Sequence, residues 1–199
     1  MSDRIIKNIV FDLGNILVDV DYKRFTDAMG WDHNKFMAFY NSRFFREFEV
    51  GQYSEEQFFV ELNKHIPLNE DDEKRYRNNI SKSFSLRPKT WARVHWLKKH
   101  YNVILFSNTN SLDFNALDKD IDLKRVLRSA YVSHAQGYIK PDPRSYRKVE
   151  DLFTLNPAET LFVDDQQKNI DGALKAGWIA EVIENEEKLF DIFEKYNIN

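Results

Sequence analysis

The sequence predicts an open α/β fold with a parallel sheet, and three observations lead to this prediction. Short runs of β-branched and aromatic residues alternate along the chain with stretches whose apolar residues recur at helical spacing. Such alternation is typical of a parallel sheet that is covered by helices on both faces. Several of the predicted strands also end directly in polar residues, and open α/β folds bind ligands beyond the carboxyl ends of their strands.

Five runs are predicted strands. Three of them are KNIVF at 7–11, VILF at 103–106 and LFV at 161–163, and each leads into a polar turn. AYVSH near residue 130 and IAEVI near residue 181 complete the set. We therefore expect a sheet of about five strands.

Helices are predicted between these strands. Proline is favoured at the first position of a helix, so one helix is expected after Pro88 and a second after Pro143, each followed by apolar residues at helical spacing. A third carries Ile170 and Leu174, and Gly177 is placed to end it. These helices are expected to cover the sheet.

A stretch from about residue 22 to 86 interrupts the alternation. It is rich in helix formers and phenylalanine and contains no convincing buried strand, so we expect an insert of four helices. The expected breaks lie at Met29-Gly30, at Gly51-Gln52 and at Ile66-Pro67-Leu68. The predicted domains are then an α/β core, 1–21 and 87–199, and a helical subdomain, 22–86.

Composition excludes several classes of protein. The formal net charge is -3, from 29 basic and 32 acidic residues scattered along the chain, which is unlike a nucleic-acid binder. No stretch approaches the roughly 20 apolar residues of a membrane span. The chain has no cysteine, hence no thiolate nucleophile, and its first ten residues lack the apolar core of a signal peptide, so a cytoplasmic location is expected.

Polar side chains follow three of the predicted strands, and a lysine follows a fourth. Because the carboxyl ends of parallel strands share one edge of the sheet, these residues are expected to converge. They are Asp12, Gly14 and Asn15 after the first strand, Ser107 and Asn108 after the second, Lys140 in GYIKPDPRSY, and Asp164 and Asp165 after LFV.

This set suits phosphoryl transfer, which needs a nucleophile, a counter-charge for the phosphoryl oxygens and a divalent cation. Asp12 can attack phosphorus and form an aspartyl-phosphate that water then cleaves. Oxygen ligands from Asp12, the Gly14 carbonyl and Asp165 suit Mg²⁺, a hard cation. Ser107 can donate a hydrogen bond to the phosphoryl group, and Lys140 supplies positive charge that also favours the ionised form of Asp12.

Four segments resemble the ordered motifs of the haloacid dehalogenase (HAD) superfamily: FDLGNILVD, LFSNTN, GYIKPDPRSY and LFVDDQQKNIDGALKAGW. The resemblance covers residues 7–178 and is greatest to the capped subgroup of sugar-phosphate phosphatases, notably the bacterial α-D-glucose-1-phosphate phosphatases, whose first motif also reads DLGN. It implies a Rossmann-like core with a four-helix, C1-type cap, and a Mg²⁺-dependent phosphatase that acts on a small phosphorylated metabolite, in particular a sugar phosphate. As to other partners, we expect neither nucleic acid nor membrane, and a monomer or a weak homodimer.

The resemblance also assigns roles to residues. It implies a nucleophile at Asp12, a carbonyl metal ligand at Gly14, phosphate contacts at Asn15, Ser107 and Asn108, a charge clamp at Lys140, a metal ligand at Asp165 and an outer-sphere partner of the metal at Asp164. Substrate-facing residues of the insert are expected between Glu47 and Tyr53.

The chain departs from the family pattern at Gly14. Most phosphatases of this superfamily carry a second aspartate at that position, which protonates the leaving group and later activates water. General acid-base catalysis of this kind contributes about 10²–10⁴-fold to the rate. A substrate hydroxyl, a water molecule, or an acid such as Asp19 or Asp21 could replace it.

Other interpretations of the motifs remain open at this stage. A receiver domain also combines Asp, Ser, Lys and Mg²⁺, but there the paired acids precede the accepting Asp, whereas Asp164 and Asp165 come last. A true dehalogenase attacks carbon and needs no metal, which makes the acidic pair harder to explain. The absence of an acid at Gly14 also leaves a non-catalytic or regulatory phosphate-binding protein on a degenerate scaffold as an alternative.

Overall fold

A five-stranded parallel sheet forms the centre of the molecule. The computed structural model describes residues 6–127 and 129–198, and the strands lie in the order β5-β4-β1-β6-β7, with every neighbouring pair parallel. Their bounds are β1 (Asn8–Phe11), β4 (Asn102–Ser107), β5 (Ser129–Val132), β6 (Thr160–Asp164) and β7 (Ile179–Val182). The predicted sheet of about five strands is confirmed.

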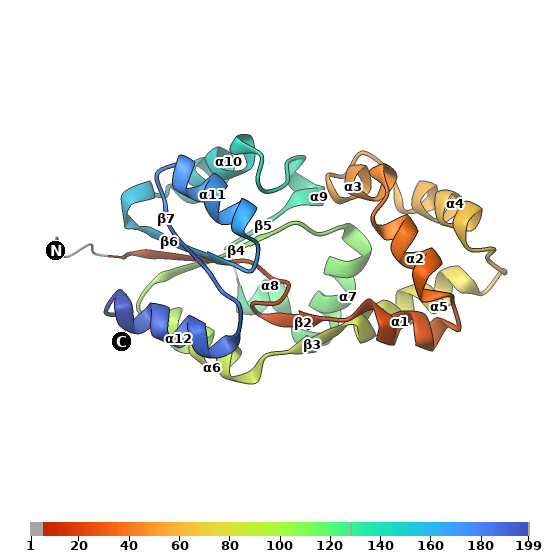
Figure 1. Cartoon of the computed structure of the whole chain (residues 1–199), viewed down its shortest axis with the longest axis horizontal. Helices are drawn as coiled ribbons and strands as arrows, with labels where there is room; N and C mark the ends of the chain where they lie inside the picture. The colour runs from red at the N-terminus through yellow and green to blue at the C-terminus, as the bar shows by residue number, and fades with distance from the viewer. Residues whose placement is uncertain (1–5, 128, 199) are drawn as a thin grey trace.

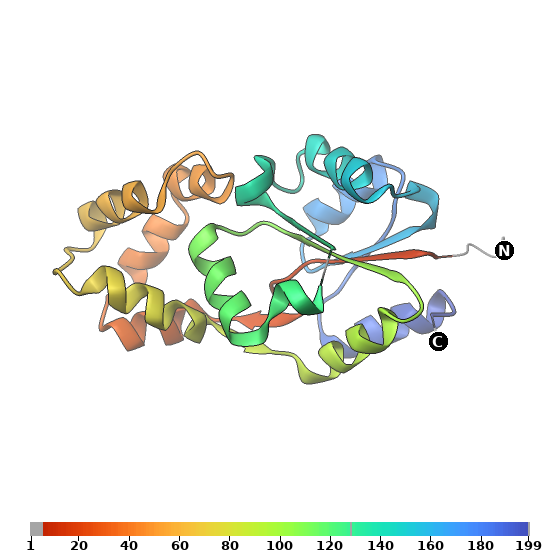
Figure 2. The ribbon, with the colours of Figure 1, turned by 180° about the vertical axis from the view of Figure 1, so that it is seen from behind.

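Helices cover both faces of this sheet (Figures 1 and 2). The helices α10 (Pro143–Phe153) and α11 (Gln167–Lys175) lie on one face, and α6 (Pro88–Leu97) and α12 (Glu186–Lys195) lie on the other. Successive residues of β1 enter different cores, because side chains alternate along a strand: Val10 packs in one core, and Ile9 and Phe11 in the other. Shorter elements complete this part of the chain: α7 (Ser111–Ile121), α8 (Leu123–Val126), α9 (Ser133–Gln136) and η2 (Pro157–Glu159).

Local signals set the ends of these helices as predicted. Proline occupies the first turn of α6 at Pro88 and of α10 at Pro143, where its missing N–H costs no hydrogen bond. After α11 the chain turns through Gly177, whose φ of 86° lies in the left-handed region.

The predicted insert is helical, with five α-helices where four were expected. They are α1 (Tyr22–Met29), α2 (His33–Tyr40), α3 (Arg43–Glu49), α4 (Glu55–His65) and α5 (Asp72–Asn79), followed by the short 3₁₀ helix η1 (Ile80–Ser83). The unexpected break separates α2 from α3. There the Ser42 side chain caps α3 by accepting a hydrogen bond from the backbone N–H of Phe45, at 3.2 Å.

The insert has a core of its own that is dominated by aromatic rings. Phe25, Phe36, Phe39 and Phe58 are fully buried in it. Leu112 of α7 joins the same cluster, so the insert also packs against the α/β part. This separate core supports the proposed division into 1–21 with 87–199 and 22–86, although the outermost residues of the core segments, 1–5 and 199, lie outside the described part of the chain.

A short ribbon joins the insert to the sheet. β2 (Val18–Val20) and β3 (Phe84–Leu86) pair antiparallel, with Asp19 opposite Ser85. Residues 22–86 were expected to contain no convincing buried strand, and β3 is a short strand that is only partly buried. Three residues are too few to show a period, and the partners are more than sixty positions apart in the sequence, so no local pattern marks the pair.

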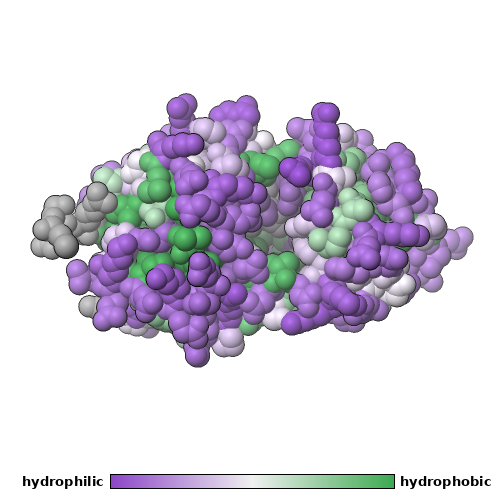
Figure 3. Space-filling model, viewed as in Figure 1, coloured by the Kyte–Doolittle hydropathy of each residue, from purple (hydrophilic) through white to green (hydrophobic). Residues whose placement is uncertain are grey.

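The face of the molecule seen in Figure 3 is largely hydrophilic, with small apolar patches, and it is hollowed where the insert meets the α/β part. Among the helices that the structure describes, none is both long and apolar enough to span a bilayer.

Candidate active site

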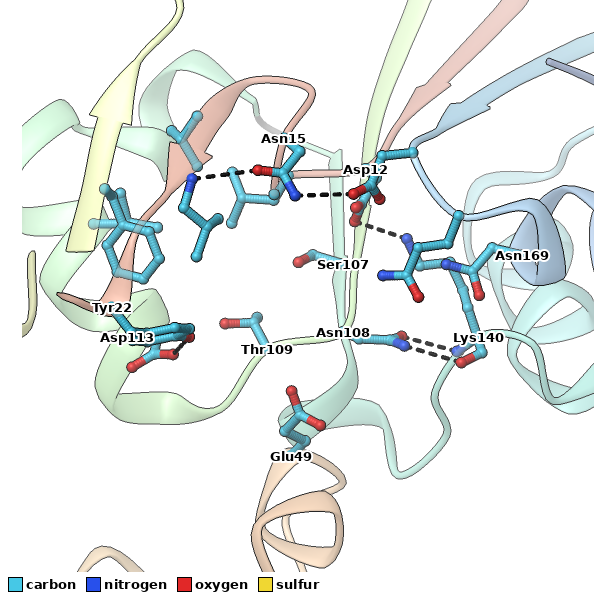
Figure 4. Close-up of a pocket in the computed structure, with 18 of the residues that line it drawn as sticks. Asp12, Asn15, Tyr22, Glu49, Ser107, Asn108, Thr109, Asp113, Lys140 and Asn169 are labelled. Carbon is cyan, nitrogen blue, oxygen red and sulfur yellow. Dashed lines mark hydrogen bonds and ion pairs between the residues drawn. The ribbon is translucent and has the colours of Figure 1, made fainter. Parts of the chain in front are cut away.

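A pocket of about 160 Å³ opens at the carboxyl ends of β1 and β4, on the side that faces the insert (Figure 4). This is where an open α/β sheet places its ligand, because strand order reverses on either side of β1. The pocket brings together every predicted site residue except Asp164, which lies directly behind it. Those that line the pocket are Asp12, Gly14, Asn15, Ser107, Asn108, Lys140 and Asp165.

Lys140 is the buried cation of the site, with 1% of its side chain exposed. Its Nζ donates to Oδ1 of Asp12 at 2.7 Å and to Oδ2 of Asp164 at 2.7 Å. The third ammonium proton goes to the backbone carbonyl of Phe106, at 2.8 Å. The lysine therefore has a fixed position and shares its single positive charge between two buried carboxylates.

Burial raises the pKa of Asp12 to about 7. Lys140 opposes this shift through its charge and hydrogen bond, while the nearby Asp164 adds to it. Burial also lowers the pKa of Lys140, but the two carboxylates raise it by more, so its net shift is upward. Lys140 thus favours ionised Asp12 as predicted, yet it does not fully offset burial. A cation bound beside Asp12 would lower its pKa further.

Asp12, Asp164 and Asp165 form an acidic cluster, in which one carboxylate oxygen from each lies within 4.8 Å of the others. Asn15 orients Asp165 by donating from Nδ2 to Oδ2 at 2.9 Å, and it holds a left-handed backbone, with φ of 56°. These hard oxygen donors at short mutual distance fit a divalent cation such as Mg²⁺.

Asp164 differs from Asp12 and Asp165 because both of its carboxylate oxygens already accept hydrogen bonds from the protein. Besides Lys140, it accepts hydrogen bonds from Asn169 Nδ2 at 2.9 and 3.0 Å and from the Gln166 N–H at 2.8 Å. It is fully buried. This arrangement favours the predicted outer position for Asp164, in which it orients Lys140 rather than binding the metal directly. Asn169 was not singled out in the sequence, although it lies within the fourth motif.

Ser107 ends β4 and Asn108 follows it, but their side chains have different contacts. Ser107 is buried and its hydroxyl group faces the pocket (Figure 4). The Asn108 amide instead forms two hydrogen bonds with the backbone of Lys140, one to its carbonyl at 2.9 Å and one from its N–H at 2.8 Å. The Asn108 side chain therefore holds the backbone of Lys140 in place.

Across the pocket lies a second group of polar residues that the sequence did not single out. Tyr22 of α1 donates its hydroxyl to Oδ2 of Asp113, at 2.9 Å. Burial raises the pKa of Asp113 to about 6 and that of Glu49 to about 7. Tyr40 and Thr109 complete this wall. A turn overhanging the pocket was expected between Glu47 and Tyr53, and Glu49 is the residue of that span that lines it.

The two acids that were suggested as replacements at Gly14 lie elsewhere. Asp19 forms an ion pair with Arg87 at 2.7 Å, and Asp21 caps α1 by accepting from the Lys23 N–H at 3.0 Å. Neither of them lines the pocket. Asp19 lies between Val18 and Val20, which do line the pocket, so the alternation of side chains along β2 places it on the opposite face.

The parallel sheet thus carries a buried aspartate-lysine pair and an acidic cluster at its carboxyl edge. The chain belongs to the haloacid dehalogenase-like hydrolases, whose family model matches residues 6–177. The expected superfamily and the expectation of an enzyme are thereby confirmed.

Three known proteins illustrate the relationship. A D-ribitol-5-phosphate phosphatase of Bacteroides thetaiotaomicron is 29% identical over 83% of this chain and 85% of its own length. A predicted HAD-like family hydrolase of Porphyromonas gingivalis has a TM-score of 0.80 at 24% identity, with 98% and 99% of the two chains covered. A HAD family enzyme of B. thetaiotaomicron, solved with magnesium and inorganic phosphate, has a TM-score of 0.79 at 21% identity, covering 93% and 99%.

Proposed function

We propose that this protein is a Mg²⁺-dependent phosphatase that hydrolyses a small phosphorylated metabolite through an aspartyl-phosphate on Asp12. The observation that carries the proposal is the arrangement around Asp12, which lies 2.7 Å from the Lys140 ammonium and within 4.8 Å of the Asp165 carboxylate. A nucleophile, a fixed positive charge and a cation site therefore meet at one point, as phosphoryl transfer requires.

The residues around this point have complementary roles. Asp12 attacks phosphorus, and Lys140 holds the attacking carboxylate in place and balances the phosphoryl charge. Asp12, Asp165 and the Gly14 carbonyl would hold Mg²⁺, which supplies further positive charge to the phosphoryl oxygens. Ser107 and the backbone N–H groups after β4 donate hydrogen bonds to the phosphoryl group. Asp164 keeps Lys140 in position.

A polyhydroxylated substrate fits the remainder of the pocket. At about 160 Å³ the space suits a small molecule, and its far wall presents the polar groups of Tyr22, Thr109 and Glu49. Hydroxyl-rich ligands need such donors and acceptors, because each buried hydroxyl must keep a hydrogen-bond partner. The first motif favours a sugar 1-phosphate such as α-D-glucose 1-phosphate, and the curated relative favours a pentitol 5-phosphate. The proposed substrates therefore include sugar phosphates and polyol phosphates.

The test is phosphate release from sugar phosphates, polyol phosphates, nucleotides and acyl phosphates, with Mg²⁺ or with EDTA. We expect selective turnover of sugar or polyol phosphates that requires Mg²⁺ and falls to background in Asp12→Asn, because the amide keeps the shape but is a poor nucleophile. Asp151→Asn, which changes an exposed aspartate on α10, is the matched control and should keep full activity.

The alternative is a non-catalytic phosphate-binding protein on the same scaffold, and it is motivated by Gly14. Folded protein that binds Mg²⁺ and phosphate esters without releasing phosphate from any of them would establish this alternative. It would also overturn the proposed phosphatase activity.

A further inference from the structure

The proposed reaction expels an alcohol oxygen that needs a proton, and Gly14 carries no acid to provide one. Protonation of such a leaving group is commonly worth about 10²–10⁴-fold in rate. Given the proposed phosphatase function, another residue of the pocket must replace the missing acid.

The carboxylic acids that line the pocket, within the part of the chain that the structure describes, are Asp12, Glu49, Asp113 and Asp165. Asp12 and Asp165 belong to the proposed metal cluster. Asp113 gives one oxygen to the Tyr22 hydroxyl, and its other oxygen, Oδ1, is sealed from solvent without a hydrogen-bond partner. An oxygen that solvent cannot reach is equally out of reach of a substrate. Glu49 remains.

Glu49 has the geometry of a proton donor. It is the last residue of α3, and its carboxylate points into the cavity from the side opposite Asp12 (Figure 4). Among the interactions of residues 6–127 and 129–198, none ties this carboxylate to a hydrogen-bond or ion-pair partner, so it is free to contact a ligand. A leaving group is expelled on the side of phosphorus opposite the nucleophile, which is the side that Glu49 faces.

The backbone of Glu49 is fastened to the α/β part. The Ser133 hydroxyl donates to the Glu49 carbonyl at 2.6 Å and accepts from the Thr109 N–H at 2.9 Å. Two residues on, Gly51 has φ of 73°, and a Cβ there would lie 2.2 Å from the carbonyl oxygen of His134. Only glycine permits this approach. The turn that carries Glu49 is thus held against the strand ends rather than hanging free.

We propose that Glu49 is the general acid, and then the general base, of the two half-reactions. As Asp12 attacks, the bond between phosphorus and the leaving oxygen breaks, its electron pair stays on that oxygen, and the oxygen takes the proton of Glu49. The ionised Glu49 next removes a proton from water as the water oxygen attacks phosphorus. The bond from phosphorus to Asp12 then breaks, its electron pair returns to Asp12, and phosphate leaves while Glu49 is protonated again.

The charges around Glu49 support a protonated side chain near neutral pH. Burial and the Asp113 charge raise its pKa, Arg46 and Lys168 lower it, and together these effects give a pKa of about 7. Tyr40 also faces this carboxyl. A general acid works best when its pKa lies near the working pH.

The experiment compares Glu49→Gln with wild type on two phosphate monoesters, one with a sugar or polyol leaving group and one with a nitrophenol leaving group. Nitrophenolate leaves without protonation, whereas an alkoxide does not. We expect Glu49→Gln to lose about 10²-fold or more in kcat on the sugar or polyol ester, and to change little on the nitrophenyl ester when formation of the aspartyl-phosphate is followed in a single turnover. The fall in wild-type activity on the sugar or polyol ester above pH 7 should disappear in the variant.

Glu47→Gln is the matched control, because Glu47 lies one half-turn away on α3 and faces Arg43 and Tyr53 instead of the pocket. It should leave both rates unchanged. Equal losses on the two esters in Glu49→Gln, or no loss on either, would overturn the assignment of Glu49. Absence of turnover of both esters by the wild-type protein would overturn the phosphatase proposal itself, and so the two failures are distinguishable.

Discussion

Lys140 shows how much the site depends on one residue. Its side chain is 1% exposed, and its ammonium lies 2.7 Å from each of two carboxylates. Removing one partner from a buried ion pair leaves an uncompensated charge, which is far more costly than losing a surface pair. Removal of Lys140 would leave two uncompensated charges, those of Asp12 and Asp164.

We therefore expect Lys140→Met to lower the free energy of unfolding by about 3–5 kcal/mol and to abolish activity. Mg²⁺ should restore part of that stability, because it supplies positive charge to Asp12. Urea unfolding with Mg²⁺ or EDTA measures both effects. Lys23→Met, which removes an exposed ion pair with Asp27, should change stability by less than about 1 kcal/mol. Equal unfolding midpoints for the two variants would contradict this account.

Asp113 makes stability depend on pH. Burial raises its pKa from 3.8 to about 6, so the folded state binds this proton more tightly than the unfolded state. The stabilisation is complete below pH 3.8 and is lost as the pH rises through about 6, a difference of about 3 kcal/mol. Asp113→Asn should remove this dependence. The measurement is the difference in unfolding free energy between variant and wild type from pH 4 to pH 7, and a difference that does not vary with pH would contradict the prediction.

The sequence predicted the residues whose role follows from strand ends, whereas for the insert it indicated only the span from Glu47 to Tyr53 and not the individual residue that lines the pocket. Asp12, Ser107 and Asp165 each follow a buried strand, so their meeting could be inferred from sheet geometry. Glu49 belongs to a helix 37 positions after Asp12, and no period or motif marks it. Its place over the pocket follows from contacts of its turn with Ser133 and His134, which are set by tertiary structure.

At the scale of elements, the contact between α3 and α9 can be tested through two glycines. Gly51 and Gly30 both have a left-handed backbone, with φ of 73° and 71°, but a Cβ meets the His134 carbonyl only at Gly51. Gly30→Ala should therefore cost the backbone strain alone, about 1–2 kcal/mol. Gly51→Ala should cost more in urea unfolding and should also lower kcat, because it displaces the turn that carries Glu49. Equal effects of the two substitutions would show that the docked turn is unimportant.

Elements with strong local signals were predicted well. Proline at the start of α6 and α10, and continuous apolar runs in β1, β4 and β6, fixed their place. The break between α2 and α3 was missed because Ser42 follows Asn41 without glycine or proline, although serine is a good N-cap. The ribbon of β2 and β3 was missed because its two short strands are separated in the sequence by the whole insert, so that no local pattern indicates their pairing.

At the scale of the whole molecule, the proposed metal site should couple ligand binding to stability. A cation that binds only the folded state stabilises it by about 2.7 kcal/mol at 100 times its Kd. We expect Mg²⁺ to raise the thermal unfolding temperature of the wild-type protein, and Asp165→Asn to remove most of that increase. Asp151→Asn, on the outer surface, should keep it. An unchanged Mg²⁺ response in Asp165→Asn would place the cation elsewhere.

The two connections between insert and sheet run side by side as β2 and β3, joined by antiparallel pairing of Val18–Val20 with Phe84–Leu86. A hydrogen-bonded ribbon of this kind bends readily across its face but resists shear and stretching within its plane. The helical unit is thus attached through two paired strands rather than through two independent connections. Because the turn that carries Glu49 is also fastened to Ser133 and lies against the His134 carbonyl, the helical unit is held on two sides of the pocket, by the ribbon on one and by this contact on the other.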